Sequence, residues 1–265
     1  MSFENEELLA NRVREKELKT LNRGVWAEEL RNGQELPLGG SLFSSELTTK
    51  LELDFESFND RLENFNEENI RSLFQKNKKA FLDWLEEVGA QIDPYLFYVC
   101  CQVQNKTHKL LAVDPKNNVS SFERREVYNK NKNKPKLSSL IGKTECGERA
   151  ALGQYLLQKV GLESIYVGGV SMDDAKDSNE YPTPHSFVVI KNRENPQETI
   201  IFDIARPKSQ HNLPRLLKPD VPFNYELLKD KEEVLVGATE VLQGRRLYFG
   251  VGEQVAGEHN IIGKG

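Results

Sequence analysis

Residues 144–161 read Thr-Glu-Cys-Gly-Glu-Arg-Ala-Ala-Leu-Gly-Gln-Tyr-Leu-Leu-Gln-Lys-Val-Gly and carry the clearest helix signal of the chain. From Glu148 to Val160 the apolar side chains recur on one side of a 3.6-residue period. Lys159 falls in the last turn, and Gly161 follows as the residue that ends the helix. The pattern predicts a helix over 148–160 with Cys146 at its entrance.

Two apolar segments downstream, 185–190 and 199–204, are typical of central strands because both of their faces are apolar. If they pair as an antiparallel hairpin with His185 opposite Asp203, the paired residue numbers sum to 185 + 203 = 388. That sum centres the turn on Glu194, within a polar segment. Cross-strand partners have Cβ atoms about 4.5–5.5 Å apart, so the carboxylate could orient the imidazole ring.

Cys146, His185 and Asp203 are the residue types of a nucleophilic site. A helix N-terminus stabilises a thiolate, an imidazole can take the thiol proton, and a carboxylate fixes the imidazole tautomer. Each residue alone also has a structural interpretation: a small buried hydrophobe, a residue at the end of a strand, and a carboxylate bonded to backbone. The combination and its order favour a Cys-His-Asp site.

The motifs around these residues resemble the transglutaminase-like core of the papain-like cysteine enzymes. They are residues 144–152, Tyr-Val-Gly-Gly at 166–169, Pro-His-Ser-Phe-Val-Val at 184–189 and Phe-Asp-Ile-Ala at 202–205. The resemblance covers about sixty residues, from 143 to 206. It implies an α+β fold with an antiparallel sheet and a catalytic Cys146, His185 and Asp203.

The resemblance implies an acyl-transfer reaction through a thioester, with no cofactor and no metal. Members hydrolyse peptide bonds, cross-link amines, or, as in several bacterial effectors, deamidate glutamine in host proteins; others have lost the triad. Ser186 and Phe187 stand where many relatives have Trp after the His, and no calcium-binding loop is apparent, so the large calcium-dependent transglutaminases are the poorer match. We expect a cysteine peptidase or protein-glutamine amidase, with cross-linking and a non-catalytic binding module as alternatives.

An oxyanion hole should combine the backbone N–H of Cys146 with a second donor from upstream. The segments 95–103 and 109–113 resemble a β-hairpin, and Gln102 or Gln104 at the end of its first strand could supply that donor. The adjacent Cys100 and Cys101 would then point to opposite faces of a strand.

The first ninety residues read as helices without visible chemistry, which divides the chain into an N-terminal helical region (1–92) and an enzyme core (93–265). The expected helices are 6–21, 25–31, 55–65 and 67–88, the last closed by Gly89. This region could grip a protein substrate.

The composition limits partners and location. With 36 basic and 41 acidic residues the net charge is −5, which gives no general attraction to nucleic acid. We expect no membrane insertion and no export signal, and three cysteines suit a reducing compartment, either the cytoplasm or a host cytosol. The sequence carries no signal for an oligomeric state.

Overall fold

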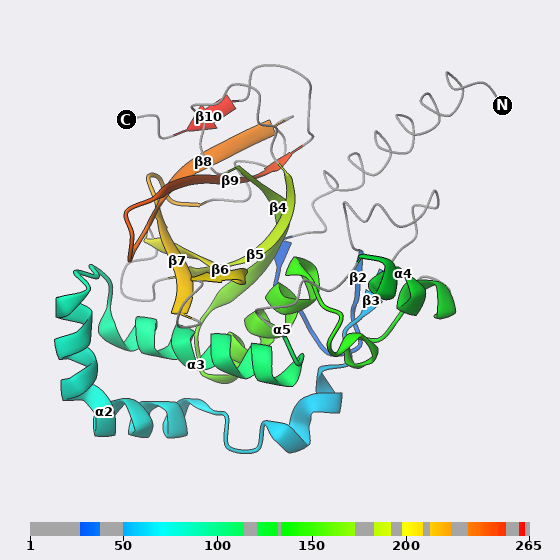
Figure 1. The fold of residues 1–265 in the computed structure, drawn as a ribbon, viewed down its shortest axis with the longest axis horizontal. Coiled ribbons are helices and arrows are strands. Elements are labelled where there is room, and N and C mark those ends of the chain that lie inside the picture. The colour runs from blue at the N-terminus through cyan, green and yellow to red at the C-terminus, as the bar shows by residue number, and fades with distance from the viewer. Residues whose placement is uncertain are drawn as a thin grey trace.

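The structure is a computed structural model. It describes residues 27–37, 50–113, 121–131, 134–172, 183–191, 198–208, 213–223, 233–252 and 260–262. Within these ranges the chain is a mixed α+β protein in which helices pack against an antiparallel β-barrel (Figure 1). The expected helix 6–21 lies outside the described residues.

Six antiparallel strands close the barrel because β9 pairs with both β8 and β4. The strands are β4 (Ser164–Met172), β5 (Thr183–Lys191), β6 (Thr199–Lys208), β7 (Leu213–Pro219), β8 (Glu233–Glu240) and β9 (Arg246–Gly252). Two short strands extend the sheet: β1 (Ala27–Glu28) pairs with β4, and β10 (Asn260–Ile262) runs parallel to β8.

The barrel strands are buried on both faces, as the apolar runs predict. Alternate residues such as Phe187 and Val189 fill the barrel interior together with Phe249, while Val188 and Ile190 belong to the core beneath the helices. Odd-numbered residues of β5 and β6 therefore point inward and even-numbered residues point toward the helices.

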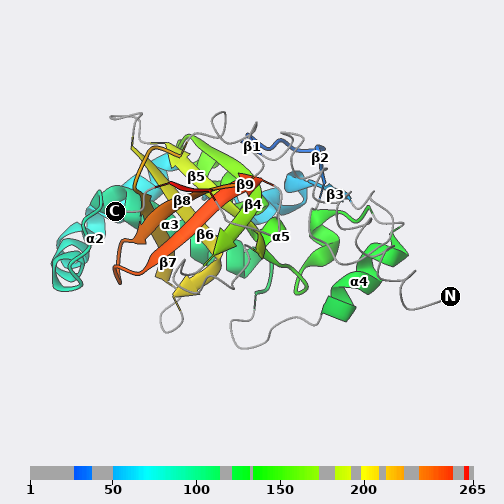
Figure 2. The same cartoon turned by 90° about the horizontal axis from the view of Figure 1, so that it is seen from above.

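Helix α5 (Cys146–Lys159) lies across β4, β5 and β6 and packs on its other side against α3 (Pro94–Leu110). It ends where the sequence predicts, with Gly161 at φ 78°. In Figures 1 and 2, α4 (Ser121–Lys130) lies on the far side of α5 from the barrel, and α2 (Glu67–Glu87) is the outer helix beyond α3.

The predicted hairpin over 95–113 is wrong: this segment forms α3. Asp93 caps the helix by accepting a hydrogen bond from the Leu96 N–H at 2.6 Å, and Pro94 occupies the first turn, where its missing N–H costs nothing. The β-branched and aromatic residues that suggested strands instead form the buried side of an amphipathic helix. Cys100 is buried and Cys101 half-buried on that helix.

The N-terminal region is less helical than predicted. The expected helix 67–88 is confirmed as α2, with Asn66 as its cap and Gly89 at φ 67°, and residues 55–61 form a 3-10 helix, η1. The segment 25–31, however, includes strand β1, and β2 (Glu35–Pro37) pairs with β3 (Lys50–Glu52) in a separate two-stranded sheet. One hydrophobic cluster joins side chains from this region to α3, α5 and the barrel exterior.

Among the residues that the structure describes, no helix combines the length and the apolar character needed to cross a membrane.

Candidate active site

Cys146 is the first residue of α5, at the helix entrance as predicted. Its side chain is half-buried, and the His185 side chain and the backbone of Ser186 both act to lower the pKa of its thiol. The first N–H groups of a helix lack partners within the helix and lie at the positive end of its dipole. This position therefore stabilises a thiolate.

His185 at the start of β5 reaches Asp203 on β6, with His185 Nε2 3.0 Å from Asp203 Oδ1. Both side chains are buried, His185 being 4% exposed and Asp203 fully covered. The structure therefore brings together the three residues that the sequence singles out.

The predicted register of these two strands is wrong by two residues. Val188 pairs with Phe202, so the paired numbers sum to 188 + 202 = 390 rather than 388. His185 and Asp203 are therefore diagonal neighbours rather than opposite ones. A shift of two residues keeps both side chains on the same face of the sheet, and diagonal neighbours remain within reach of long side chains.

The two nitrogens of the His185 ring have different partners. Nε2, at the far end of the imidazole, is the atom that meets Asp203. Nδ1 is then the nitrogen left for the Cys146 sulfur. With Nε2–H donating to the carboxylate, the neutral ring has an unprotonated Nδ1 that can accept the thiol proton; this tautomer is assigned from the hydrogen bonds.

The electrostatics favour proton transfer from thiol to imidazole. Burial acts to raise the pKa of Cys146, but hydrogen bonding and charge attraction from His185 outweigh it and lower that pKa. Burial acts to lower the pKa of His185, yet the charge of Asp203 and the hydrogen bonds to Asp203 and Cys146 raise it to about 9. Both shifts favour the thiolate–imidazolium form of the pair over the neutral form.

A buried ion pair supports the start of α5. Arg124 of α4 donates from Nε and Nη2 to Glu148 Oε1 at 3.0 and 2.6 Å, and the Tyr128 hydroxyl donates to the same oxygen at 2.9 Å. The other oxygen of Glu148 accepts the backbone N–H of Glu145 at 3.0 Å, one half of a capping box. Arg124 and Glu148 thus fix the turn that carries Cys146.

Arg149, three residues after Cys146, ties the helix entrance to β6. Its Nη2 donates to the Thr144 carbonyl at 2.7 Å, and its Nη1 donates to the Ala205 carbonyl at 3.2 Å. The residue before the N-cap and the residue two after Asp203 are thereby held by one guanidinium group.

The barrel interior holds two charged residues that the sequence does not predict as part of the site. Arg215 lies opposite Asp203 on β7, with Nη1 3.6 Å from Asp203 Oδ2, and its Nε donates to Glu240 Oε1 of β8 at 2.6 Å. The mostly apolar strand segments 213–219 and 233–240 each contain two charged residues, and the sequence does not distinguish Arg215 from Lys218 or Glu240 from Glu233. Neither segment reveals the other as its partner.

The structure gives Gln104 hydrogen-bond partners other than the thiol. On α3 its amide donates to the Ile204 carbonyl at 3.2 Å and lies 2.7 Å from His108 Nε2, in the interface between helix and sheet. Gln102, also on α3, is half-buried. The hairpin on which their oxyanion role was based does not form.

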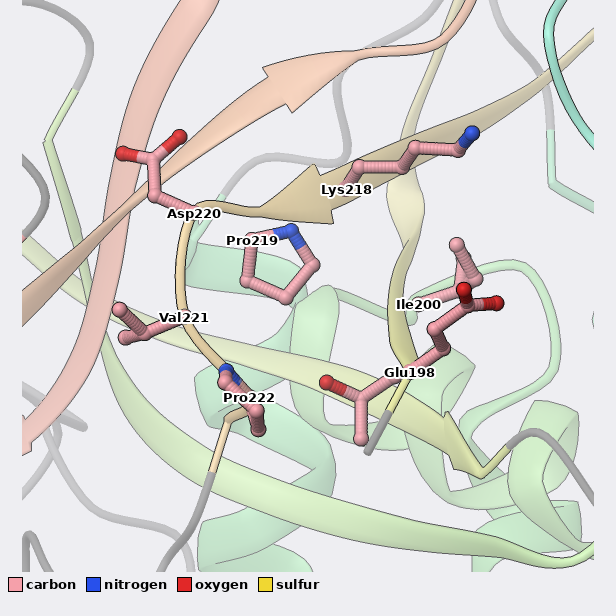
Figure 3. A pocket seen from close by; sticks show the side chains of 8 residues that line it. Glu198, Ile200, Lys218, Pro219, Asp220, Val221 and Pro222 are labelled. Atoms are coloured by element: carbon pink, nitrogen blue, oxygen red, sulfur yellow. The ribbon is translucent and has the colours of Figure 1, made fainter. Parts of the chain in front are cut away.

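A pocket of about 250 Å³ lies at the opposite end of the same strands. It is lined by the start of β6, from Glu198, and by the end of β7 with residues 219–222, and Figure 3 shows Glu198 and Asp220 on different sides of it. Asp220 is paired with Arg246. The residues that line the pocket include no cysteine and no histidine.

Across the described part of the chain, no group of three or more His, Cys, Asp or Glu side chains could hold a metal ion. Comparisons with known proteins give no match, whether to family models, to curated proteins or to solved structures.

Proposed function

We propose that the protein is a thiol-dependent acyl-transfer enzyme in which Cys146 attacks an amide carbonyl. The observation that carries this proposal is the placement of Cys146 at a helix N-terminus beside His185, whose Nε2 lies 3.0 Å from Asp203 Oδ1. The lowered pKa of Cys146 and the raised pKa of His185 support it, since an activated thiol needs such a pair.

The barrel with a helix packed on it, and the order Cys, His, Asp along the chain, agree with a papain-like, transglutaminase-like core. We propose this relationship on the architecture and the motifs of residues 143–206.

In the proposed reaction the Cys146 thiolate adds to the carbonyl carbon, forming a C–S bond and a tetrahedral oxyanion. Backbone N–H groups at the start of α5 would stabilise that charge. The C–N bond then breaks while the His185 imidazolium gives its proton to the departing nitrogen. This leaves a thioester and a neutral imidazole.

The neutral imidazole next takes a proton from water, or from an entering amine, as that nucleophile attacks the thioester. The C–S bond breaks and the thiolate leaves, with the proton again on His185. Asp203 holds the ring in place through both halves of the cycle. Entry of water gives a peptidase or amidase, and entry of an amine gives cross-linking.

We propose a protein substrate, with peptide hydrolysis or glutamine deamidation ahead of cross-linking. The test incubates the wild type and Cys146→Ala with a cell lysate and compares protein masses. New fragments indicate a peptidase, glutamine converted to glutamate indicates a deamidase, and adducts indicate amine transfer.

Cys146→Ala and His185→Ala should each abolish turnover while the protein stays folded, and Asp203→Asn should leave a residue of activity. A non-catalytic binding module would give identical masses with wild type and Cys146→Ala, together with a slow, ordinary alkylation of Cys146. That pair of results would overturn the proposed function.

A further inference from the structure

The site continues inside the barrel as a line of alternating charges. From the thiol it runs through His185 of β5, Asp203 of β6 and Arg215 of β7 to Glu240 of β8. The three strands beyond β5 that supply it are sequence neighbours in the barrel wall. Negative and positive groups alternate along this line when the Cys146–His185 pair is charged.

These charges are removed from water. Asp203 is fully covered, Glu240 is 2% exposed and Arg215 is 8% exposed. A buried charge is costly unless an opposite charge and hydrogen bonds compensate it. Interactions between such groups are also screened much less by salt than those at the surface.

The distances show which partner Arg215 favours. Its Nε is 2.6 Å from Glu240 Oε1, whereas its Nη1 is 3.6 Å from Asp203 Oδ2. The shorter contact of Asp203, at 3.0 Å, is with His185 Nε2. The guanidinium is thus bonded to Glu240 and only neighbours the carboxylate that His185 uses.

We propose that Glu240 is a positioning residue of the Cys146 site: by binding Arg215 it keeps that guanidinium from taking Asp203 away from His185. The inference rests on the proposed function, because it assigns Glu240 a role in the same thiol site. Glu240 acts through Arg215 and Asp203 and does not touch the reacting atoms.

The neighbours of His185 on β4 and inside the barrel are uncharged. Gly169 is its partner on β4, and the rings of Phe187 and Phe249 approach it at 6.4 Å. Among the residues that the structure describes, the charged or titratable groups that act on His185 are Cys146 from α5 and Asp203 from β6. Loss of the Glu240 charge would add one net positive charge behind Asp203, which disfavours the imidazolium.

The test is the pKa of His185, read by NMR in the full chain without substrate. The chain has four His, so the titrating signals are few, and a His185→Gln variant assigns the relevant one. Glu240→Gln should lower the His185 pKa by about one unit, equivalent to a tenfold loss in the ratio of charged to neutral Cys146–His185 pairs. Alkylation of Cys146 by iodoacetamide near pH 6 should slow accordingly.

The double variant Arg215→Met with Glu240→Gln is the matched control, because it removes the competing guanidinium as well. It should return the His185 pKa to the wild-type value or above it, an outcome that a merely structural role of Glu240 would not produce. If Glu240→Gln does not fold, Glu240→Asp takes its place and should lower the same pKa by a smaller amount.

An unchanged or raised His185 pKa in the folded Glu240 variant would overturn the proposal. The proposal would also fail if the His185 pKa were as low in the double variant as in the single variant. These results are independent of turnover. A protein with the expected coupling but no amide-cleaving activity would overturn the proposed function and leave the role of Glu240 standing.

Discussion

Gly153 of α5 lies so close to Ile204 of β6 that a Cβ atom at position 153 would be 1.8 Å from Ile204 Cδ1. Gly153 is about two helical turns beyond Cys146, and Ile204 directly follows Asp203. The absence of a side chain at 153 therefore sets how deeply α5 lies on β6. That depth determines how the thiol sits relative to the imidazole and carboxylate.

Gly153→Ala should destabilise the protein by about 1–3 kcal/mol, the usual range for overpacking a filled core. Ile204 is fully buried, so its side chain has little room to turn away. The free energy of unfolding, measured by urea titration, is the readout.

The matched control is the double variant Gly153→Ala with Ile204→Val, which removes the Cδ1 atom that the new methyl group would strike. Ile204→Val alone should cost about 0.5–1.5 kcal/mol, and the double variant should be more stable than the sum of the two single changes. Simple additivity would show that the contact does not set the packing of α5.

The site could be predicted from the sequence because it requires only that His185 and Asp203 lie on the same face of the sheet, whatever the exact pairing of their strands. His185 and Asp203 remain on one face whether the paired numbers sum to 388 or 390. Cys146 could be placed because a helix start has local signals. Such features survive moderate errors in the strand pairing.

Arg215 and Glu240 could not be predicted in the same way. Their contact depends on the register with which β7 pairs β8, and the sequence between these strands does not fix that register. The helix α3 was missed for another reason: the buried side of a helix and a strand can both be rich in aromatic and β-branched residues. There the Asp93-Pro94 start was the more informative signal.

Cys146 should be the thiol that iodoacetamide modifies first at neutral pH. Burial raises the pKa of Cys100 well above its usual range and that of Cys101 to about 12, whereas the pKa of Cys146 is lowered. Alkylation requires the thiolate, so modification of Cys146 should be at least about tenfold faster than that of the other two. Peptide mass mapping after short exposures gives the three rates.

His185→Ala should slow the modification of Cys146 while leaving Cys100 and Cys101 unchanged, which makes these two cysteines internal controls. Faster labelling of either one in the wild type would show that the assigned nucleophile is wrong.

The free energy of unfolding should depend less on pH in the wild type than in the Cys146→Ala variant. The raised pKa of His185, about 9 against an unfolded value near 6.5, stabilises the fold fully below pH 6.5, and this contribution is lost as the pH rises to 9. The lowered pKa of Cys146 has the opposite slope: its contribution is fully present above pH 9 and is lost as the pH falls through the native value. In the wild type the two slopes offset each other, because folding moves one proton from thiol to imidazole.

Cys146→Ala removes one of these slopes. Cys146 itself helps to raise the pKa of His185, so in this variant that pKa lies below 9. The unfolding free energy of the variant should fall as the pH rises from 6.5 to the His185 pKa, by at most about 1.4 kcal/mol per pH unit, with the wild type flatter over the same interval. Urea titrations at three pH values measure both curves. Parallel curves would mean that the thiol and imidazole do not share a proton in the folded state.

Glu148→Gln should make the protein less stable and its thiol more acidic at the same time. Breaking a buried ion pair by removing one partner costs about 3–5 kcal/mol, and Glu148 is fully buried against Arg124. Its negative charge acts to raise the pKa of Cys146, so its loss should lower that pKa further. Alkylation of Cys146 near pH 5, at a temperature where the variant is folded, should therefore become faster.

Arg124→Met separates the electrostatic effect from a general loosening of the helix start. It breaks the same ion pair and should cost a similar amount of stability, but it removes a positive charge, so the pKa of Cys146 should rise and alkylation near pH 5 should slow. Thermal unfolding measures the shared loss of stability, and the alkylation rates measure the opposite shifts. If both variants changed the thiol reactivity in the same direction, the exposure of a loosened helix start, rather than the charges beside it, would control the thiol.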